Sequence, residues 1–422
     1  MDGGVSVWDG GFCGTAELKR RSVQGSVLSM LNQGVRWVLN LGAMAILARL
    51  LTPEDFGLLA MVYAVVSLAE MFTELGLSTA TVQSATISGE QASTLFWLNL
   101  GLSVCIGGAV AIGAPALGAF YREPRLTAIT LGLSATCPLT ALGLQHRALL
   151  SRQMRFAALA GIDLVALTIS LVAAIAGAWV GLGYWALVIR HYVFAGVTCL
   201  GLWWTSGWRP GVPKRHCGAG EMVLFGANLT AFDLIYCLSR SLDKVLLGWR
   251  WSTSVVGLYD KAYQLLMLPT YQIGKPLSRV MVPALSRLRD DPGRFRSYYR
   301  KGTLAVSSLG MPLVAFTFVA ADDVIPFFLG DQWRGSVPIY RVLAPAAYWG
   351  CIDVAADWIY AAMGQAGRKL RWGIVSSIAT AIGFAIGIPW GAIGMAAALS
   401  IVFCGLTMGP AGLVYCFRGS PV

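Results

Sequence analysis

The sequence predicts an all-α polytopic membrane protein, with about twelve transmembrane helices in two six-helix lobes around a central cavity. Hydrophobic residues make up 56% of the 422-residue chain and charged residues only 13%, a composition typical of a protein that lies in lipid. Apolar runs of bilayer-spanning length recur along most of the chain. These runs are too long and too continuous for the alternating strands of a membrane barrel, so helices are expected.

Twelve spans result from a search for runs of about 18 to 25 mostly apolar residues. Residues 1–27 precede the first span, and the span-length apolar run that follows has no small-residue cleavage site at its end, so we expect an uncleaved cytoplasmic N-terminal tail. Residues 417–422 form a short C-terminal tail. The expected spans cover residues 28–51, 56–80, 94–120, 126–146, 157–180, 184–204, 222–247, 255–285, 302–321, 337–363, 371–388 and 391–416.

A basic segment at residues 205–221 separates six spans from six, which predicts an N-lobe at 28–204 and a C-lobe at 222–416. A weak internal similarity supports this division. Residues 55–58 and 255–258 both end in Gly-Leu and are 200 positions apart. Two parallel six-helix halves with the substrate path between them are a recurring plan among transporters.

Lys and Arg residues collect in every second gap between the spans. Nineteen lie in the tails and in alternate gaps, and five lie in the intervening gaps. Because cytoplasmic loops carry the excess of Lys and Arg, both termini are expected in the cytoplasm. The gap around Glu90 departs from this rule because it has no Lys or Arg.

Several classes of function are disfavoured by the composition and by the absence of motifs. The net charge of +11 follows the gaps between spans, whereas a nucleic-acid-binding protein clusters its charge on one folded face. The nine Cys residues are scattered without a C-x-x-C pair, and the three His residues lie far apart, so we expect no metal site. The sequence shows no nucleophile–base pair and no Gly-rich phosphate loop, so we expect neither an enzyme nor a cofactor.

Charged residues inside the spans are the candidate functional residues. A charge in the hydrocarbon region costs about 2.5–3.5 kcal/mol or more, so it needs a partner or a wet cavity. On the eighth span the polar residues share one helical stripe, and on the first span Arg36 lies between Asn32 and Asn40 at four-residue spacing. An excess of cations is suited to a phosphate or an acidic sugar. The candidate cavity cations are Arg36, Arg240, Lys261, Lys275 and Arg279.

Four intramembrane carboxylates are candidates for ion coupling, namely Glu70, Glu74, Asp353 and Asp357. Glu70 and Glu74 are one helical turn apart, and two like charges at that distance cannot easily both ionise in a low dielectric. A protonated member would suit proton coupling. A buried carboxyl group that is hydrogen-bonded to a neighbouring helix explains the pattern equally well.

Internal ion pairs are the structural alternative for some of these charges. Asp243 with Lys244, Asp260 with Lys261, and Asp233 with Arg240 could hold helices in place. This alternative does not cover the whole set, because Arg36, Lys275 and Arg279 have no acid within one turn on their own helices.

Several local strings resemble the polysaccharide transporter family of oligosaccharide flippases, which belongs to the superfamily that also holds multidrug exporters and lipid II flippases. They occur in family order and cover about residues 28–400. The strings are RLLTPEDFG at 49–57, ELGL at 74–77, RQMRF at 152–156, GYWALV at 183–188, DKVLLG at 243–248, GLY at 257–259, PALSR at 283–287 and LGDQW at 329–333.

The resemblance implies that the protein moves a polyprenyl-diphosphate-linked oligosaccharide repeat unit across the bacterial inner membrane by alternating access. The product would feed capsule, exopolysaccharide or O-antigen synthesis, with a polymerase and glycosyltransferases as further partners. Such flippases commonly have fourteen helices, whereas this chain has twelve expected spans.

Two other functions remain open from the sequence. The first is an ion-coupled exporter of small molecules, including drugs, on the same fold; the cationic stripe argues against cationic drugs as its cargo. The second is a membrane enzyme such as a glycosyltransferase or polymerase, but those enzymes usually carry a large outer loop, and no outer gap here exceeds about 15 residues.

Overall fold

The computed structural model describes residues 15–74, 78, 81–82, 84, 87–213 and 241–417. All regular secondary structure in these ranges is helical, so the predicted all-α class is confirmed. Eleven of the twelve expected spans coincide with helices, and the remaining span, 222–247, lies largely outside the described residues. Seven described helical segments are long and apolar enough to cross a membrane by length and composition.

The chain divides into two compact units, which are described separately. Unit 1 comprises Met1–Leu51 and Val62–Cys237, and unit 2 comprises Thr52–Met61 and Leu238–Val422. The first helices are α1 (Thr15–Leu50), α2 (Pro53–Glu74), α4 (Gly89–Tyr121), α5 (Arg125–Ser134), α6 (Thr136–Arg152), α7 (Phe156–Trp179) and α8 (Tyr184–Ser206). They are followed by α10 (Thr253–Arg287), α11 (Pro292–Val319), α12 (Ala321–Leu329), α13 (Ser336–Ala362), α14 (Ala366–Gly387), α15 (Gly391–Val402) and α16 (Pro410–Phe417).

The helices differ from the expected spans mainly at their ends. Helix α1 begins within the expected N-terminal tail, at Thr15. The fourth expected span is two helices, α5 and α6, which meet at Ala135. The last span contains a π-helical segment, Phe403–Thr407, between α15 and α16.

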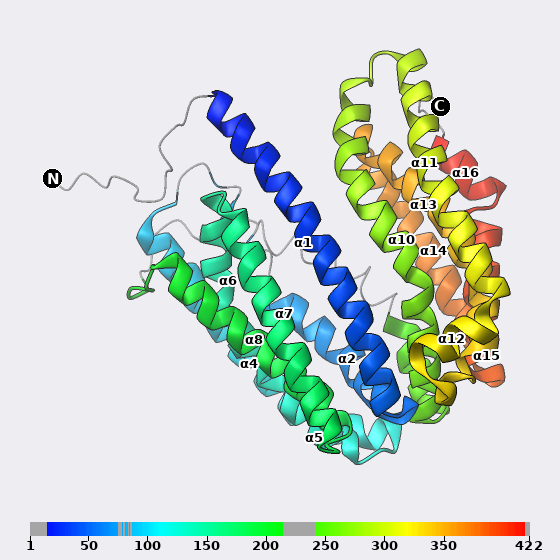
Figure 1. The fold of residues 1–422 in the computed structure, drawn as a ribbon, viewed down its shortest axis with the longest axis horizontal. Helices are drawn as coiled ribbons and strands as arrows, with labels where there is room; N and C mark the ends of the chain where they lie inside the picture. Colours follow the sequence, from blue (N-terminus) through cyan, green and yellow to red (C-terminus); the bar gives the residue numbers. More distant parts are fainter. Residues whose placement is uncertain are drawn as a thin grey trace. The chain divides into compact units, whose positions relative to one another are not determined.

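In unit 1, α7 packs against both α1 and α8, while α4 packs against α5 and α6 (Figure 1). Small apolar clusters join these helices. Ala43 of α1 packs with Leu167 and Leu171 of α7, and Phe96 of α4 packs with Leu149 of α6. Van der Waals packing of this kind is one way in which helices associate in lipid.

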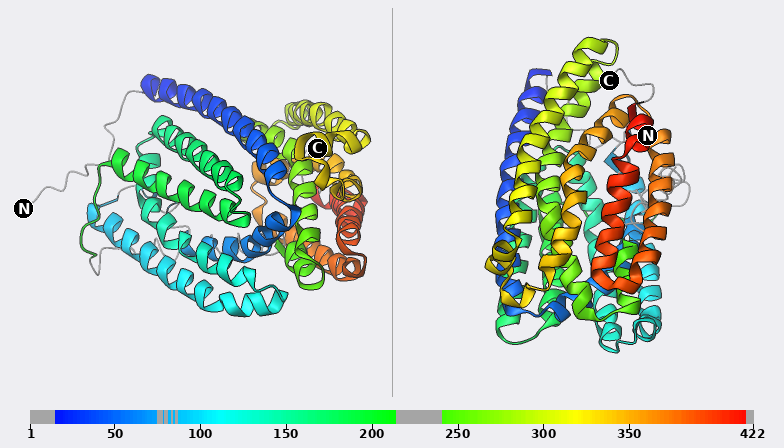
Figure 2. Two further views of the ribbon diagram at one scale, coloured as in Figure 1. Left: turned by 60° about the horizontal axis from the view of Figure 1, so that its bottom comes forward. Right: turned by 90° about the vertical axis from the view of Figure 1, so that its right-hand side faces the viewer.

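In unit 2, the long helix α13 is the central element. It packs against α10, α11 and α15, and α14 pairs with α15 (Figure 2). Trp358 of α13 is fully buried, and its indole Nε1 donates to Ser278 Oγ of α10 at 2.7 Å. This bond satisfies a polar atom that would otherwise be buried without a partner.

The helix starts contain residues that cap their free backbone N–H groups. At α2, Asp55 Oδ2 accepts from the Thr52 backbone N–H at 2.9 Å, and Pro53 occupies the first helical position. At α4, Ser88 and Gln91 form a reciprocal capping box. The TPED part of the first sequence string is therefore a helix-start signal.

The first turns of α2 and α10, both in unit 2, touch through glycine. A Cβ on Gly57 would lie 1.8 Å from the Thr253 carbonyl oxygen, and a Cβ on Gly257 would lie 1.9 Å from the Pro53 carbonyl oxygen. No residue except glycine can therefore occupy either position without moving a helix. The two glycines are those that mark the 200-residue internal similarity.

Candidate functional site

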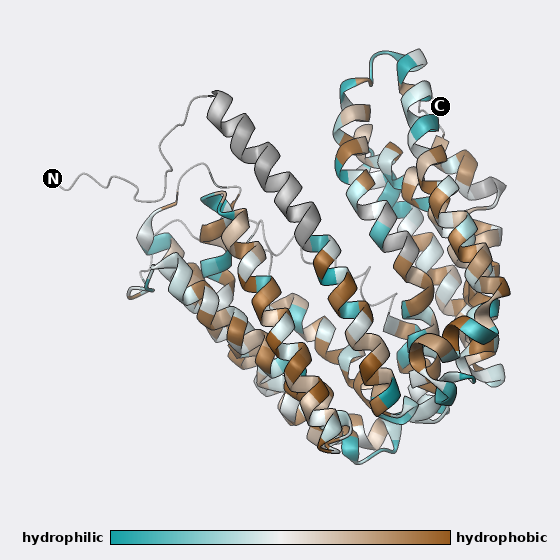
Figure 3. Cartoon of the chain, viewed as in Figure 1, coloured by the Kyte–Doolittle hydropathy of each residue, from teal (hydrophilic) through white to brown (hydrophobic). Residues whose placement is uncertain are grey.

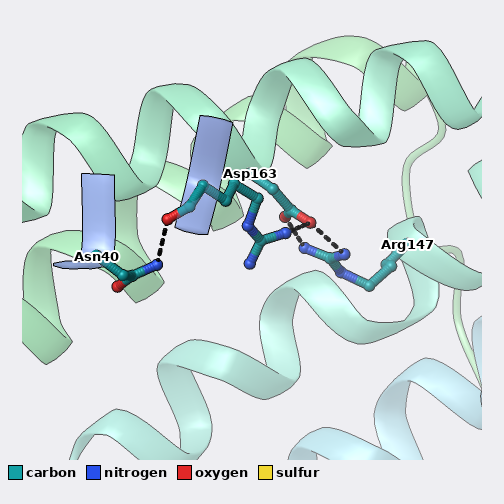
Figure 4. Close-up of polar contacts among 4 residues, drawn as sticks. Asn40, Arg147 and Asp163 are labelled. Atoms are coloured by element: carbon teal, nitrogen blue, oxygen red, sulfur yellow. Dashed lines mark hydrogen bonds and ion pairs between the residues drawn. The ribbon is translucent and has the colours of Figure 1, made fainter. Parts of the chain in front are cut away.

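The predicted cation Arg36 belongs to a group of charged residues in unit 1, which we call the Asp163 cluster. Its members are Arg36 and Asn40 on α1, Arg147 on α6, Asp163 on α7 and Arg190 on α8. Figure 4 shows the contacts of Asn40 and Asp163 with Arg36, and of Asp163 with Arg147. All five lie within helices. The cluster therefore depends on the packing of four helices of one unit.

Asp163 is shared by two guanidinium groups. Arg147 binds it in a bidentate manner, with Nη2–Oδ1 at 2.5 Å and Nη1–Oδ2 at 3.3 Å. Arg36 Nη1 donates to the same Oδ2 at 3.1 Å. The Asp163 side chain is 14% exposed, whereas both arginine side chains are 37% exposed, so each guanidinium is partly accessible.

Arg190 is connected to this pair through an amide. Its Nη2 donates to Asn40 Oδ1 at 3.1 Å, and Asn40 Nδ2 donates to the Arg36 carbonyl oxygen at 2.8 Å. The next residue on α8, His191, lies against Tyr63 of α2, with their ring centroids 5.2 Å apart. Polar groups from α1, α2, α6, α7 and α8 thus lie at neighbouring places in unit 1.

The cluster contains three guanidinium groups and one carboxylate. A guanidinium has five N–H donors in a fixed fork, and the contacts with Asp163 and Asn40 use only some of them. Arginine forks match the oxygens of phosphate and carboxylate groups, and they bind most strongly where water is scarce. The arrangement is therefore chemically suited to an anionic group.

The predicted cation Lys261 lies in a different environment, in unit 2. Its side chain is buried, its Nζ donates to Gln264 Oε1 at 3.0 Å, and it lies 4.2 Å from the ring centroid of Phe56. Gln264 in turn donates to Asp260 Oδ2 at 2.6 Å. Lys261 is thus held by α2 and α10 in a packed part of the protein.

Asp260 joins this residue to a second lysine. Lys244 Nζ lies 2.7 Å from Asp260 Oδ1, and the Lys244 backbone N–H donates to the buried Asp243 carboxylate at 2.7 Å. We call Asp243, Lys244, Asp260, Lys261 and Gln264 the Asp260 network. It holds two acids and two lysines. The ion pair observed in this region joins Asp260 to Lys244.

Sequence strings from both halves of the chain meet beside this network. Trp333 of LGDQW is fully buried, with its ring 5.5 Å from Phe56 of RLLTPEDFG. Gly330 of the same string has φ 103°, a value that favours glycine. Ser336 Oγ donates to the Leu258 carbonyl oxygen of GLY at 2.9 Å. These strings specify packing and turns in unit 2.

The other predicted residues lie at several separate places. Glu70 is half-buried on α2, close enough to the Cys137 thiol of α6 to interact with it electrostatically. Asp353 is half-buried on α13, and Asp357 is exposed, with Lys369 Nζ at 2.9 Å. Arg279 is exposed on α10. Arg240 and the side chains of Glu74 and Lys275 lie outside the described residues.

Sequence reasoning missed three members of the Asp163 cluster, namely Arg147, Asp163 and Arg190. Asp163 and Arg190 are charges within predicted spans, so the rule that selected Arg36 would also have found them. Arg147 lies one residue beyond an expected span and was assigned to a cytoplasmic gap. Helix α6 continues to Arg152, which places Arg147 within the helix.

A profile of the polysaccharide biosynthesis protein family matches residues 46–338 of the chain. The chain is 25% identical to the lipopolysaccharide biosynthesis protein WzxC of Escherichia coli K12, over 77% of this chain and 67% of that protein. It is 23% identical to the teichuronic acid biosynthesis protein TuaB of Bacillus subtilis, over 82% of this chain and 74% of that protein. It is 24% identical to the succinoglycan biosynthesis transport protein ExoT of Rhizobium meliloti, over 86% of this chain and 73% of that protein.

Solved structures share the fold at low sequence identity. The lipid II flippase MurJ, in an inward closed conformation, superposes with a TM-score of 0.75 and 14% identity, covering 93% of this chain and 87% of that chain. An inward-facing multidrug resistance transporter of the MATE family superposes with a TM-score of 0.69 and 15% identity, covering 91% and 94%. The fold is therefore that of a multi-pass membrane transporter.

Proposed function

The chain belongs to the polysaccharide biosynthesis protein family, and on that basis we propose that it is a flippase for a polyprenyl-diphosphate-linked oligosaccharide. It moves the repeat unit across the bacterial inner membrane for the synthesis of capsule, exopolysaccharide or O-antigen. The observation that carries this proposal is the Asp163 cluster, where three guanidiniums and one carboxylate lie on the membrane-embedded helices of unit 1. No bond is made or broken in the cycle, and the protein acts as a carrier.

In this proposal the cluster binds the diphosphate or an acidic sugar, while the polyprenyl tail stays in lipid. Arg36 and Arg147 share one carboxylate, so an incoming phosphate competes with Asp163 for the same N–H donors. Exchange between an internal and an external anion allows the cations to be retained in the membrane without a ligand. Alternating exposure of the cluster to the two leaflets then completes transport.

The sign of the charge favours an anionic cargo over a cationic drug. An exporter of cationic drugs on the same fold needs an acidic binding region, whereas the Asp163 cluster has an excess of guanidinium groups. The likeness to a MATE transporter is one of fold. The small-molecule exporter is therefore the second candidate.

The proposed orientation places both termini in the cytoplasm. The supporting observation is the charge difference between the two ends of unit 2. The α10–α11 connection carries six cations between Arg287 and Lys301, whereas the ion pairs Arg334–Asp331 and Arg341–Asp322 lie near the opposite ends of the helices. A polymerase and glycosyltransferases are the proposed partners.

The double variant Arg36→Gln/Arg147→Gln tests the cluster. We expect it to lower the transfer of a polyprenyl-diphosphate oligosaccharide across proteoliposomes by at least about 100-fold, because two charge-assisted contacts are lost. Arg125→Gln is the control, since Arg125 is the first residue of α5 and pairs with Glu123, outside the cluster. Normal transfer by the folded double variant would refute the assignment.

A second double variant, Lys275→Gln/Arg279→Gln, tests the predicted cationic stripe of α10. Loss of polymer export from cells, with the variant still folded in the membrane, is the expected result. Full export by this variant, together with failure of the Arg36→Gln/Arg147→Gln variant, would confine the binding role to unit 1.

A further inference from the structure

The hairpin formed by α10 and α11 carries the most concentrated basic surface among the described residues of unit 2. Both helices are long, with 35 and 28 residues. The hairpin tip extends beyond the ends of α13 and α14 (Figures 1 and 2) and is strongly hydrophilic (Figure 3). Its exposed cations are Arg287, Arg289, Arg294, Arg296, Arg300 and Lys301.

The length of the helices places this tip at the depth of lipid headgroups. At about 1.5 Å per residue, α10 is roughly 52 Å long, whereas the hydrocarbon core is about 30 Å thick. Residues 292–301 precede the apolar part of α11 and add about 15 Å beyond it. Each headgroup layer is about 5 to 8 Å thick, so the cations span that layer and the adjoining water.

The tip contains fewer acids than cations. Two carboxylates, Asp290 and Asp291, lie between the helices, and Asp291 is already engaged in the N-cap of α11. Its oxygen also lies 3.4 Å from Arg294 Nε, in a pair whose members are 80% and 50% exposed, and such a pair is worth little. The tip therefore has a net excess of exposed positive charge.

The tip is attached to the rest of unit 2 through its inner face. Phe295 and Tyr299 are buried, and the Tyr299 ring lies 6.3 Å from the Phe417 ring of α16. Arg296 and Arg300 occupy the exposed side of the same helix, and Tyr298 is 44% exposed beside them. A firmly packed helix thus presents cations together with an amphipathic aromatic ring, a combination typical of the membrane interface.

We propose that the α10–α11 hairpin binds the headgroups of anionic phospholipids in the adjoining leaflet. The proposal rests on the inside orientation given above, because the cytoplasmic leaflet carries the anionic surface potential that attracts juxtamembrane basic clusters. The guanidinium and ammonium groups of the hairpin bind the lipid phosphates, whereas the Asp163 cluster lies in unit 1 and is assigned to cargo. The ligand of the hairpin is the phospholipid itself.

The experiment measures lipid retention by the purified full-length chain, without transport. Native mass spectrometry compares retained phosphatidylglycerol with retained phosphatidylcholine for the wild-type chain and for Arg289→Gln/Arg296→Gln/Arg300→Gln. We expect the variant to bind phosphatidylglycerol at least about tenfold more weakly, because each basic residue near the surface contributes measurably to anionic-lipid binding. Phosphatidylcholine retention should not change.

The matched control is Arg250→Gln/Arg334→Gln/Arg341→Gln, which removes three cations elsewhere in unit 2. It should retain phosphatidylglycerol like the wild-type chain. Equal loss in the two triple variants, or no loss in either, would overturn the proposal. If the hairpin variant does not fold, the single variant Arg296→Gln is measured in its place, with a smaller expected loss and the same criterion.

A competition experiment tests whether the hairpin binds phospholipid or the transported oligosaccharide. Polyprenyl-diphosphate oligosaccharide is added to the wild-type chain loaded with phosphatidylglycerol. Retention of the hairpin-dependent phospholipid supports the proposal, and its stoichiometric displacement would reassign the hairpin to cargo. Failure of the flippase assay with hairpin-dependent lipid binding intact would instead refute the proposed function alone.

Discussion

The Asp163 cluster of unit 1 has more cations than acids, whereas the Asp260 network of unit 2 is charge-balanced. Arg36 and Arg147 are each 37% exposed around one shared carboxylate. In unit 2, Asp260 and Lys261 are almost completely buried, and two acids match two lysines. The two environments suit two different roles for charge inside a membrane protein. Partly open surplus charge is suited to a ligand, and closed, balanced charge fixes helices.

The largest expected effect tests whether the region around the Asp260 network is structural. Gly57→Ala places a Cβ 1.8 Å from the Thr253 carbonyl oxygen. Because this oxygen belongs to the backbone, no side-chain rotation can relieve the clash. We expect loss of folded protein, seen as failure to recover a monodisperse peak after detergent extraction. Gly108→Ala is the control, since a Cβ there meets nothing within 4 Å. A well-folded Gly57→Ala chain would show that this contact is not required.

The second prediction addresses the balance of the Asp260 network. Asp260→Asn removes the 5% exposed carboxylate that pairs with the 25% exposed Lys244 side chain, and removing one partner of a buried pair costs up to about 3–5 kcal/mol. Thermal unfolding in detergent should show a large decrease in Tm. The double variant Lys244→Met/Asp260→Leu should recover much of it, because a buried pair can often be replaced by apolar residues. A double variant as unstable as Asp260→Asn would argue against an ion-pair role.

The corresponding change in unit 1 should separate binding from stability. Asp163→Asn removes the shared carboxylate from Arg36 and Arg147, which are partly exposed and can be solvated. We expect a smaller decrease in Tm than for Asp260→Asn. We also expect about a tenfold decrease in oligosaccharide transfer, because the guanidiniums lose their fixed positions. If Asp163→Asn unfolds the chain while transfer per folded molecule is unchanged, the cluster is structural.

The smallest expected effect is the loss of stability when the exposed Glu123–Arg125 ion pair is removed. Arg125 Nε lies 2.8 Å from Glu123 Oε1, and these hydrogen bonds lower the pKa of Glu123 below its ordinary value. The stability that the ionised Glu123 contributes is therefore fully present above the ordinary Glu pKa of about 4.3. It is lost as the pH falls through the lower pKa of Glu123 in the folded protein. Glu123→Gln should cost less than about 1 kcal/mol at pH 7, measured by unfolding against pH. A larger loss would place Glu123 among the structural charges.

The sequence predicted the helices well because bilayer thickness imposes a length and an apolar composition on each span. It also selected Arg36 and Lys261, because charge is expensive in lipid wherever it occurs. It could not say that Arg36 meets Asp163, which is 127 residues away on another helix, or that Lys261 lies under Phe56. Those facts depend on how helices pack, which the spacing along one helix does not specify.

The expectation for the family strings was also incomplete in one respect. RLLTPEDFG and LGDQW resemble a transporter family, but their residues supply a helix cap, a left-handed glycine and a packed aromatic pair. The cations of the Asp163 cluster lie outside all the family strings. Arg147 comes shortly before RQMRF at 152–156, and Arg190 comes shortly after GYWALV at 183–188. The strings that identify the family thus do not contain the residues proposed to bind the cargo.

The contact of Gly57 with Gly257 has an evolutionary consequence. Each glycine leaves room for the backbone of the other helix, so enlarging one residue requires the two helix starts to separate, after which the second glycine is no longer needed. Related chains should therefore gain or lose the two glycines together. Their alignment columns would then record which descendants keep this crossing and which have adopted a wider one.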